Sequence, residues 1–406
     1  MDVPSHSVSP VSPSPVSVDQ LNVASRAVFL RVDFNVPRNS DGTLLDDTRI
    51  REALPTIQHL LRQKSKVILA SHLGRPKGHD KKDSLLNVAE RLAALIDQEV
   101  IFPEDCVGDA VRKLCKDLRE GEIILLENLR FHPEEEANNP SFAETLSKLA
   151  EVYVTDAFGT LHREHASTHG MVHHFKEKGI GFLVQKELKF LDQLLHQPQK
   201  PFVAVLGGAK VSDKIELIDS LVSKVDTLLL GGGLSYTFLK AKGVNIGDSR
   251  FESEKIHTAQ KILDKADSLG VSVILPRDHR AAPALSPDAT AKIVTELSEG
   301  QKGLDVGPET EKEFAEHLSK ARTIFWNGPL GVFEHPAFAE GTKSVAKAIA
   351  EASKNHQALS VVGGGESLAA VATTGLSDQI SHLSTGGGAT LEYLEGRGLP
   401  GLKVLL

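Results

Sequence analysis

The hydrophobic and polar positions of this 406-residue chain fall into two recurring patterns. Short, mostly apolar runs rich in β-branched residues recur along the chain, and several are separated by stretches with apolar residues at helical spacing. The runs predict buried strands and the stretches predict helices. The expected strands are AVFLRV at 27–32, KVILAS at 66–71, EIILL at 122–126, EVYVTD at 151–156, PFVAVLGG at 201–208, DTLLLGGG at 226–233, VSVILP at 271–276, TIFWNG at 323–328 and LSVVGGG at 359–365.

Two of the intervening stretches predict helices most clearly. In segment 84–96 the apolar residues recur three and four positions apart, as on the buried face of a helix. Asn139 followed by Pro140 is typical of a helix start, because asparagine caps free N–H groups and proline fits the first turn. Repeated strand and helix units predict an α/β fold with mainly parallel sheets covered by helices on both faces.

Length and a proline-containing break predict two domains. One hydrophobic core rarely serves more than about 300 residues. The amphipathic segment 184–196 is followed by QPQKP at 197–201, which suits a hinge. We therefore expect two doubly wound, Rossmann-like parallel-sheet domains, residues 18–185 and 201–389, joined by a helix and hinge at 186–200.

Composition limits the classes of function. Residues 1–17 are rich in Ser, Pro and Val and lack the apolar core of a secretory signal, so we expect a disordered tail. A formal charge of -8 argues against nucleic acid or anionic membrane as partners, and no apolar run is long enough to span a bilayer. Cys106 and Cys115 match neither a redox pair nor a zinc cluster. We expect a soluble, cytoplasmic protein.

Glycines follow the expected strands of the second half. GGAK, GGG, NGP, GGGES and STGGG occur there in order, where ligands bind in doubly wound folds. Glycine lets backbone N–H groups approach a phosphate, and a helix N-terminus adds partial positive charge. Neither a Walker loop nor GxGxxG is present, so the sequence predicts a phosphate site of another design. Lys210 and Lys214, four apart, are expected to project from one face of a starting helix.

Charged side chains occupy the corresponding positions of the first half. Arginines at adjacent strand ends form a cluster suited to phosphate or carboxylate. The candidates are Asp33 and Asn35 after the first strand, Arg49 near a helix start, His72 and Arg75 after the second strand, Arg130 after the third and Arg163 after the fourth. This asymmetry predicts phosphoryl transfer between a nucleotide and a small anion, a reaction that needs positioning and positive charge.

Eight motifs in order resemble those of the phosphoglycerate kinase family, over the chain from about residue 18 to its end. They are RVDFNVP, SHLGRP, LLENLRFHPEEE, DAFGTLHR, GGAKVSDK, GLDVGPET, WNGPLGVFE and STGGGATLEYLEG. The resemblance implies reversible, Mg²⁺-dependent phosphoryl transfer in glycolysis and gluconeogenesis, in which 1,3-bisphosphoglycerate and ADP give 3-phosphoglycerate and ATP. It also implies a monomer with two lobes that close by hinge bending, and a C-terminal segment, about 390–406, that returns to the N-terminal domain.

The resemblance also implies site residues. For 3-phosphoglycerate these are Asp33, Phe34, Asn35, Arg49, His72, Leu73, Gly74, Arg75, Arg130 and Arg163. For ATP or ADP they are Gly208, Lys210, Lys214, Gly303, Gly328, Leu330, Glu334, Gly364, Gly365, Glu366 and Ser367. Arg49, Lys210, Lys214 and Gly387 would act on the transferring group, and Glu366 would bind the magnesium ion.

Three segments depart from the family pattern. Glu366 stands in GGGES where the family usually has aspartate, which lengthens the expected Mg²⁺ ligand by one methylene; we expect activity to be retained. Leu161 is unusual in DAFGTLHR. Segment 275–287, LPRDHRAAPALSP, is expected to form a proline-rich loop on the nucleotide side.

Two other hypotheses stay open. The histidines at 162, 165, 169, 173 and 174 could hold zinc, because His165 and His169 have the i, i+4 spacing of one helical face. Alternatively, the chain could bind nucleotide without turnover. The complete set of arginines, lysines and Glu366 argues against that second hypothesis.

Overall fold

A computed structural model of the protein describes residues 14–406. The first 13 residues of the predicted tail lie outside the described residues. The chain forms two compact units: Met1–Glu187 with Gly398–Leu406 is unit 1, and Leu188–Arg397 is unit 2. The division falls inside α6 (Phe182–His196), and the returning C-terminal segment begins at Gly398 rather than near residue 390.

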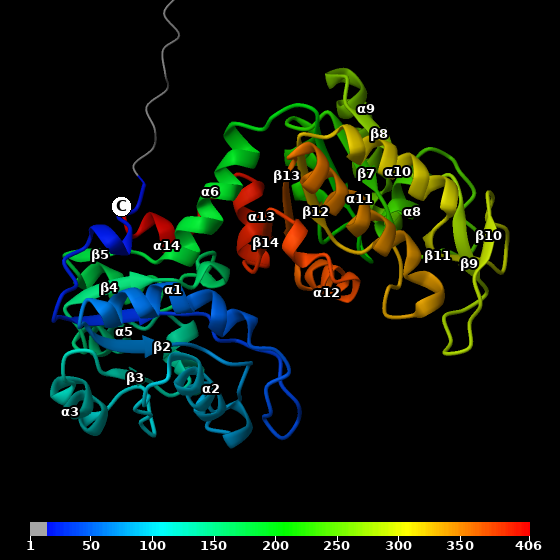
Figure 1. The fold of residues 1–406 in the computed structure, drawn as a ribbon. Helices are drawn as coiled ribbons and strands as arrows, with labels where there is room; N and C mark the ends of the chain where they lie inside the picture. The colour runs from blue at the N-terminus through cyan, green and yellow to red at the C-terminus, as the bar shows by residue number, and fades with distance from the viewer. Residues whose placement is uncertain (1–13) are drawn as a thin grey trace, which may run out of the picture. The chain divides into compact units, whose positions relative to one another are not determined.

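Unit 1 is built on a five-stranded parallel sheet of order β3-β2-β1-β4-β5 (Figure 1). The strands are β1 (Ala27–Arg31), β2 (Lys66–Ala70), β3 (Ile123–Leu125), β4 (Val152–Thr155) and β5 (Glu177–Ile180). The first four were predicted, whereas β5, with the sequence EKGI, has no apolar run to reveal it. The backbone of Ile180 donates to the carbonyl of Val16, so the end of the predicted tail pairs with this edge strand.

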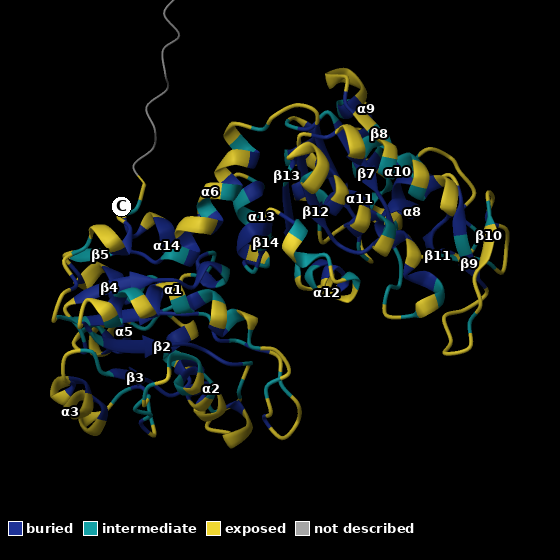
Figure 2. Cartoon of the chain, viewed as in Figure 1, coloured by how far each residue is buried: buried dark blue, intermediate teal, exposed yellow. Residues whose placement is uncertain are grey.

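Helices cover the sheet of unit 1. They are α1 (Thr48–Arg62), α2 (Leu86–Ile96), α3 (Asp109–Asp117), α4 (Pro133–Glu136), α5 (Pro140–Ser147) and α14 (Pro400–Lys403). Asn139 caps α5 as predicted, accepting hydrogen bonds from two backbone N–H groups. The apolar faces of α1 and α2 share one core with alternate residues of the strands, such as Val28 and Leu30 (Figure 2). On the other face Phe29 stacks on Tyr153.

A buried carboxyl group caps the first turn of α6. Asp156 follows β4, and its Oδ1 accepts a hydrogen bond of 3.1 Å from the backbone N–H of Val184, while Oδ2 is buried and has no hydrogen-bond partner in the described part of the chain. Burial raises the pKa of Asp156 from 3.8 to about 7, because the hydrogen bonds from Thr56, Val184 and Leu183 do not offset the lost hydration.

Asp156→Asn is expected to change the pH dependence of the stability of unit 1. The raised pKa means that stability is full below pH 3.8 and is lost as pH rises toward 7. The loss approaches about 4 kcal/mol at 1.36 kcal/mol per pKa unit, and the amide should remove it. Hydrogen exchange of unit 1 peptides between pH 5 and 8 measures this, with exposed Asp117→Asn as control. Equal pH profiles for Asp156→Asn and the unsubstituted chain would contradict it.

Unit 2 contains a six-stranded parallel sheet of order β14-β13-β12-β6-β7-β8. Its strands are β6 (Phe202–Leu206), β7 (Thr227–Leu230), β8 (Ser272–Ile274), β12 (Thr323–Asn327), β13 (Leu359–Gly363) and β14 (His382–Ser384). Five of them were predicted, and the short edge strand β14 was not. The α/β class with two parallel sheets is confirmed.

The helices of unit 2 complete its layers. They are α7 (Ile215–Val222), α8 (Gly232–Ala241), α9 (Ile256–Leu269), α10 (Pro308–Lys320), α11 (Glu340–His356), α12 (Gly365–Thr374) and α13 (Gly388–Leu394). Residues of α10, α11 and α12 pack with one face of the sheet around the fully buried Trp326. In residues 14–406, no helix is both long and apolar enough to cross a membrane.

A small antiparallel sheet of order β10-β9-β11 was not expected. It comprises β9 (His279–Ala282), β10 (Lys292–Val294) and β11 (Lys302–Val306). The prediction of a loop over 275–287 is therefore wrong at residues 279–282. The HRAA sequence of β9 has no apolar alternation; it is a strand because it pairs with partners on both sides, which sequence periodicity does not reveal.

Candidate functional site

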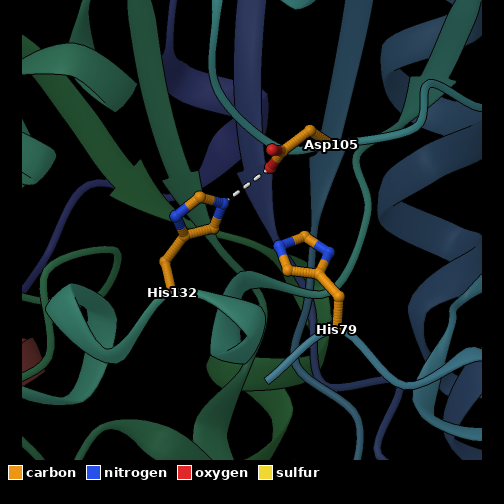
Figure 3. A group of neighbouring side chains, drawn as sticks. All are labelled: His79, Asp105 and His132. Atoms are coloured by element: carbon orange, nitrogen blue, oxygen red, sulfur yellow. Dashed lines mark hydrogen bonds and ion pairs between the residues drawn. The ribbon is translucent and has the colours of Figure 1, made fainter.

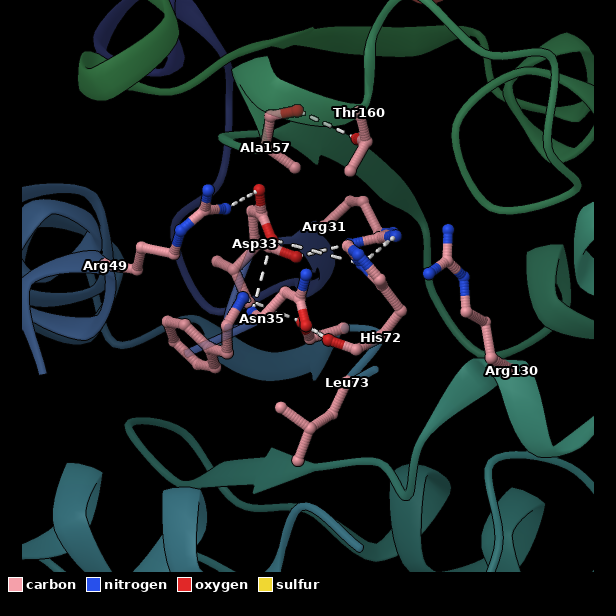
Figure 4. A network of polar contacts seen from close by, with 12 residues as sticks. Arg31, Asp33, Asn35, Arg49, His72, Leu73, Arg130, Ala157 and Thr160 are labelled. Atoms are coloured by element: carbon pink, nitrogen blue, oxygen red, sulfur yellow. Dashed lines mark hydrogen bonds and ion pairs between the residues drawn. The ribbon is translucent and has the colours of Figure 1, made fainter. Parts of the chain in front are cut away.

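Unit 1 gathers its charged candidates at the carboxyl ends of neighbouring strands (Figure 4). The connections from β1 run to β2 on one side, and β4 lies on the other, so the β1 and β4 ends form a topological switch point. Open α/β sheets bind ligands at such points. Asp33 and Asn35 follow β1, His72 follows β2, and Arg130 follows β3. The structure thus brings together residues that are up to 97 positions apart.

Arg49 and Asp33 form an ion pair at the centre of this cluster. Arg49 comes from the first turn of α1, and its side chain is 30% exposed, whereas that of Asp33 is 11% exposed. Burial would raise the pKa of Asp33, but the charges of Arg49 and Arg31 hold it at about 2. Asp33 therefore stays ionised and holds the guanidinium of Arg49 in place.

His72 is a neutral hydrogen-bond donor within this cationic cluster. Its Nδ1 lies 3.3 Å from Nη2 of Arg31, which can only donate, so Nδ1 accepts and the proton resides on Nε2. Burial, reinforced by the positive charges of Arg31, Arg130 and Arg49, lowers the pKa of His72 well below 6.5. The ring can thus donate a hydrogen bond to an anion without carrying charge.

Arg31 belongs to this cluster, although the sequence reasoning did not select it. It is almost fully buried, and its Nε donates to Oγ of Ser167 at 2.8 Å. Ser167 in turn donates to the buried carboxylate of Glu135 through its backbone N–H, at 2.9 Å, and through its hydroxyl. The signal was an arginine inside the apolar run AVFLRV, where a buried charge needs a partner.

Arg130 has a buried N–H donor that is not used by any group in residues 14–406. Its Nη1 donates to the carbonyl of Gly74 at 2.7 Å, and Nη2 pairs with Glu136 at 3.1 Å. Its Nε is buried and has no partner among the described residues. Gly74 is held from the other side by Oδ1 of Asn35, which accepts its N–H at 2.9 Å. A buried, unpaired guanidinium N–H is costly unless a ligand accepts it.

Arg163 and Arg75 lie at the more open part of the set. Nε of Arg163 donates to Nε2 of His162 at 3.2 Å, and Arg75 is exposed. Burial and the charges of Arg31, Arg130 and Arg163 lower the pKa of His165 from 6.5 to about 4. The positive charge around His165 therefore disfavours binding of a metal cation there.

The histidine hypothesis for zinc also loses its geometric basis. No α-helix spans His165 and His169, because residues 166–169 form turns and a 3-10 helix begins at Gly170. The expectation that the two rings share one helical face is therefore wrong. Within the described residues, the one group of three His, Cys, Asp or Glu side chains that could hold a metal ion lies elsewhere in unit 1.

Phe34 and Leu73 were predicted to contact substrate, but their side chains belong to the core of unit 1. The backbone N–H of Phe34 donates a hydrogen bond to Oγ of Ser71 at 2.8 Å. The side chain of Asn128 accepts a hydrogen bond from the N–H of Leu73 and donates one to its carbonyl. These two residues position the loops that carry Asp33, Asn35 and His72.

Unit 2 contains a cavity of about 310 Å³ next to its glycine loops. Five of the predicted nucleotide residues line it: Gly208, Gly303, Leu330, Glu334 and Glu366. Lys210, Lys214, Gly328, Gly364, Gly365 and Ser367 are not among its lining residues. The cavity size lies in the range of small-molecule sites.

The glycine loops after β6, β12 and β13 are bonded to one another. The N–H of Gly208 donates to the carbonyl of Pro329 at 2.8 Å, and the N–H of Gly328 donates to Oγ of Ser367 at 2.6 Å. Gly328 has φ +95°, and a Cβ there would collide with Nζ of Lys214. A Cβ there would also collide with the backbone carbonyl oxygen of Gly207, which cannot move aside as a lysine tip can, so glycine is required at this positive φ. Ser367 and Gly328 therefore shape the floor beside the cavity.

Lys210 and Lys214 do not share a helical face, so that prediction is wrong. α7 begins only at Ile215, and a turn closed by a bond from Lys214 N–H to the carbonyl of Val211 precedes it. Lys210 is exposed, whereas Nζ of Lys214 donates to the backbone carbonyl of Asn327 at 3.0 Å. Burial lowers the pKa of Lys214 from 10.5 to about 8, against the opposing charges of Glu366 and Asp213.

Glu366 and Gly387 lie at the N-termini of two helices of unit 2. Glu366 lies in the first turn of α12, is exposed and lines the cavity. Among the described contacts, none engages its carboxylate in a hydrogen bond or ion pair, so its oxygens can serve a ligand. Gly387, with φ +54°, precedes α13, which begins at Gly388.

The family model described as phosphoglycerate kinase matches residues 18–397. The chain belongs to the phosphoglycerate kinase family. This membership confirms the resemblance seen in the sequence. Members of the family transfer a phosphoryl group between 1,3-bisphosphoglycerate with ADP and 3-phosphoglycerate with ATP, a glycolytic step, and the chain is a kinase of this family.

Curated phosphoglycerate kinases are similar along nearly the whole chain. The protein from Acidobacterium capsulatum is 51% identical over 407 residues, which cover 97% of this chain and 99% of its own. That from Anaeromyxobacter dehalogenans is 51% identical over 392 residues, covering 95% and 98%. The solved phosphoglycerate kinase of Coxiella burnetii has a TM-score of 0.86 and 41% identity, covering 96% of this chain and 98% of that one.

The cavity of unit 2 is also lined by residues that sequence reasoning missed. These residues are Tyr236 and Asp305. Tyr236 does not belong to a strand-end motif, so the sequence contains no signal for it. The Tyr236 hydroxyl bonds Nδ1 of His279 at 3.1 Å and occupies the space where a side chain at Gly303 would lie. Burial raises the pKa of Asp305 from 3.8 to about 7, and one of its oxygens accepts the N–H of Gly341. Gly303 is thus selected by packing against Tyr236.

Proposed function

We propose that unit 1 binds 3-phosphoglycerate and unit 2 binds ATP, and that transfer between them depends on magnesium. The observation that carries this proposal is the cluster of guanidinium groups around neutral His72 in unit 1, with the unpartnered Nε of Arg130 in it. Such a cluster suits a small molecule with both phosphate and carboxylate groups.

The acceptor needs no general base. A carboxylate is already ionised near neutral pH, so the barrier lies in gathering negative groups and stabilising charge on the phosphoryl group. Arg49 approaches this task with its guanidinium already oriented by Asp33, which reduces the reorganisation needed on binding. Arg130 and His72 supply hydrogen bonds from buried positions, where such bonds are strongest.

In unit 2 the cavity holds the nucleotide, and the glycine loops and Lys214 hold its phosphates. Lys214, with its pKa of about 8, is mainly protonated at neutral pH, and a phosphate beside it would favour the charged form further. We assign Lys210, Gly364, Gly365 and Gly387 to the same phosphates, through the exposed ammonium of Lys210 and the backbone N–H groups of the glycines.

Glu366 fits a magnesium site. Mg²⁺ is commonly held by one or two carboxylates together with phosphate oxygens of the substrate, and Glu366 offers an exposed carboxylate at the cavity. Glu366 and the nucleotide phosphates would hold the ion, whose charge offsets the negative charge of the transferring group. Direct transfer also requires that the two substrates meet, so we propose closure about segment 186–200. We further propose that the enzyme is monomeric and cytoplasmic.

The proposal predicts turnover that depends on Mg-ATP and 3-phosphoglycerate, which a coupled assay measures. Glu366→Gln should raise the Mg²⁺ concentration needed for half-maximal rate by about tenfold or more, because a neutral amide is a poorer ligand. Glu351→Gln, which changes an exposed residue of α11, should leave the requirement unchanged.

Two results would contradict these assignments. Absence of turnover by the folded chain would favour nucleotide binding without catalysis. An unchanged Mg²⁺ requirement in Glu366→Gln would remove Glu366 from the metal site while leaving the reaction in place.

A further inference from the structure

Three side chains of unit 1 converge outside both candidate substrate sites (Figure 3). His79 comes from the segment after β2, Asp105 precedes α3, and His132 is the residue before α4. One ring nitrogen of each histidine and one carboxylate oxygen of Asp105 all lie within 4.8 Å of one another. No sequence motif joins these positions, because the tertiary fold alone brings them together.

Neighbouring groups contact all three residues, although the side chain of His79 is exposed. The ring of His132 stacks on Phe142 with centroids 5.3 Å apart, and the ring of His79 packs on Phe131 at 4.6 Å. The two imidazoles meet edge to face at 5.7 Å. Oδ1 of Asp105 accepts the N–H of Cys106 at 2.6 Å. Metal ligands are typically oriented by such outer contacts.

His132 and Asp105, two of the three potential ligands, already form a hydrogen bond, so a metal ion would replace the proton between them. Nε2 of His132 lies 2.6 Å from Oδ1 of Asp105. Around a tetrahedral zinc ion with bonds of about 2.0 to 2.1 Å, neighbouring ligand atoms are about 3.3 Å apart. The pair must separate slightly and His79 must move inward, which its exposed side chain permits.

We propose that His79, Asp105 and His132 bind a zinc-class divalent transition-metal ion. Two neutral imidazoles and one carboxylate give a site charge of −1 and a borderline ligand set, which suits Zn²⁺ rather than Mg²⁺ or Ca²⁺. Three protein ligands leave a fourth position to water. The ion would tie together three segments of unit 1 that are distant in sequence, so it would stabilise that unit.

The site is adjacent in sequence to the candidate substrate arginines. His79 lies four residues after Arg75, and His132 lies two residues after Arg130. An ion bound here would therefore restrict the segments that carry both arginines. This makes the Michaelis constant for 3-phosphoglycerate the kinetic constant through which occupancy would act.

Isothermal titration of the metal-free full-length chain with ZnCl₂, in a non-chelating buffer, tests the proposal. One Zn²⁺ per chain is expected, and His79→Ala should weaken binding by about 100-fold or more. His79 is the variant of choice because it is exposed and its loss should not unfold the chain. His174→Ala, which removes another exposed histidine of unit 1, should bind as the unsubstituted chain does.

X-ray absorption of the zinc-loaded protein should show two imidazole nitrogens with oxygen ligands. Asp105→Asn and His132→Ala should also lose binding, with circular dichroism reporting whether they remain folded. Absence of stoichiometric binding, or equal affinity in His79→Ala and the unsubstituted chain, would overturn the proposal. Equal loss in His174→Ala would do the same, since it would indicate nonspecific binding to surface histidines.

Discussion

Arg49→Ala is expected to lower kcat about 10²- to 10³-fold while leaving the Kd for ATP nearly unchanged. Loss of one preorganised donor from the transition state typically costs about 3 to 4 kcal/mol. Arg49 belongs to unit 1, whereas the ATP candidates belong to unit 2, so its removal should act on the reacting group rather than on the nucleotide. The coupled assay and equilibrium binding of ATP measure the two effects separately.

Arg51→Ala is the matched control for this experiment. Arg51 lies on the same helix, is about half exposed and pairs with Asp47. Its loss should change kcat less than about twofold, since exposed ion pairs contribute little. Arg49→Lys keeps the charge beside Asp33 and separates charge from guanidinium geometry. A parallel fall of kcat and ATP affinity in Arg49→Ala would show that Arg49 is wrongly assigned to the transferring group.

Arg31→Met is expected to destabilise unit 1 by about 3 to 5 kcal/mol. The substitution leaves the buried carboxylate of Glu135 without the positive charge that it reaches through Ser167. Burial already raises the pKa of Glu135 against the opposing charge of Arg31. Hydrogen exchange of peptides that contain β1 and β4 measures this loss in the full chain.

The double variant Arg31→Met with Glu135→Gln should recover at least half of the lost stability, because no buried charge then remains unpaired. Arg26→Met, at the partly exposed ion pairs with Glu151 and Glu177 before β1, should cost about 1 kcal/mol. The single tryptophan, Trp326, lies in the core of unit 2, so its fluorescence provides an internal reference. Additive losses in the double variant would mean that Arg31 and Glu135 are not coupled.

Much of the fold could be predicted because its core strands carry their own signal. AVFLRV, KVILAS and PFVAVLGG are apolar over most of their length, as is typical of strands buried on both faces of a parallel sheet. The edge strands β5 and β14 and the antiparallel strand β9 carry no such pattern, since they are short and partly exposed or polar. Their pairing partners decide their structure.

The candidate site divides in the same way. Asp33, His72 and Arg130 could be selected because parallel strands bring their carboxyl ends to one edge, so position after a strand predicts proximity. The relative placement of Lys210 and Lys214 could not, because it depends on a turn that ends before α7 starts. The burial of the Phe34 and Leu73 side chains could not be predicted either, since burial is a property of the assembled core, and their contact with substrate stays a prediction.

By itself the sequence determined the α/β class, the strand ends that carry charge or glycine, and the family. These properties depend on neighbouring residues or on the order of motifs, so periodicity and motifs along the chain encode them. Only the tertiary structure decided that Arg31 is held by Ser167 and Glu135, that Tyr236 requires Gly303, and that two histidines and Asp105 converge. Such contacts join residues far apart in the chain, and packing rather than local propensity selects them.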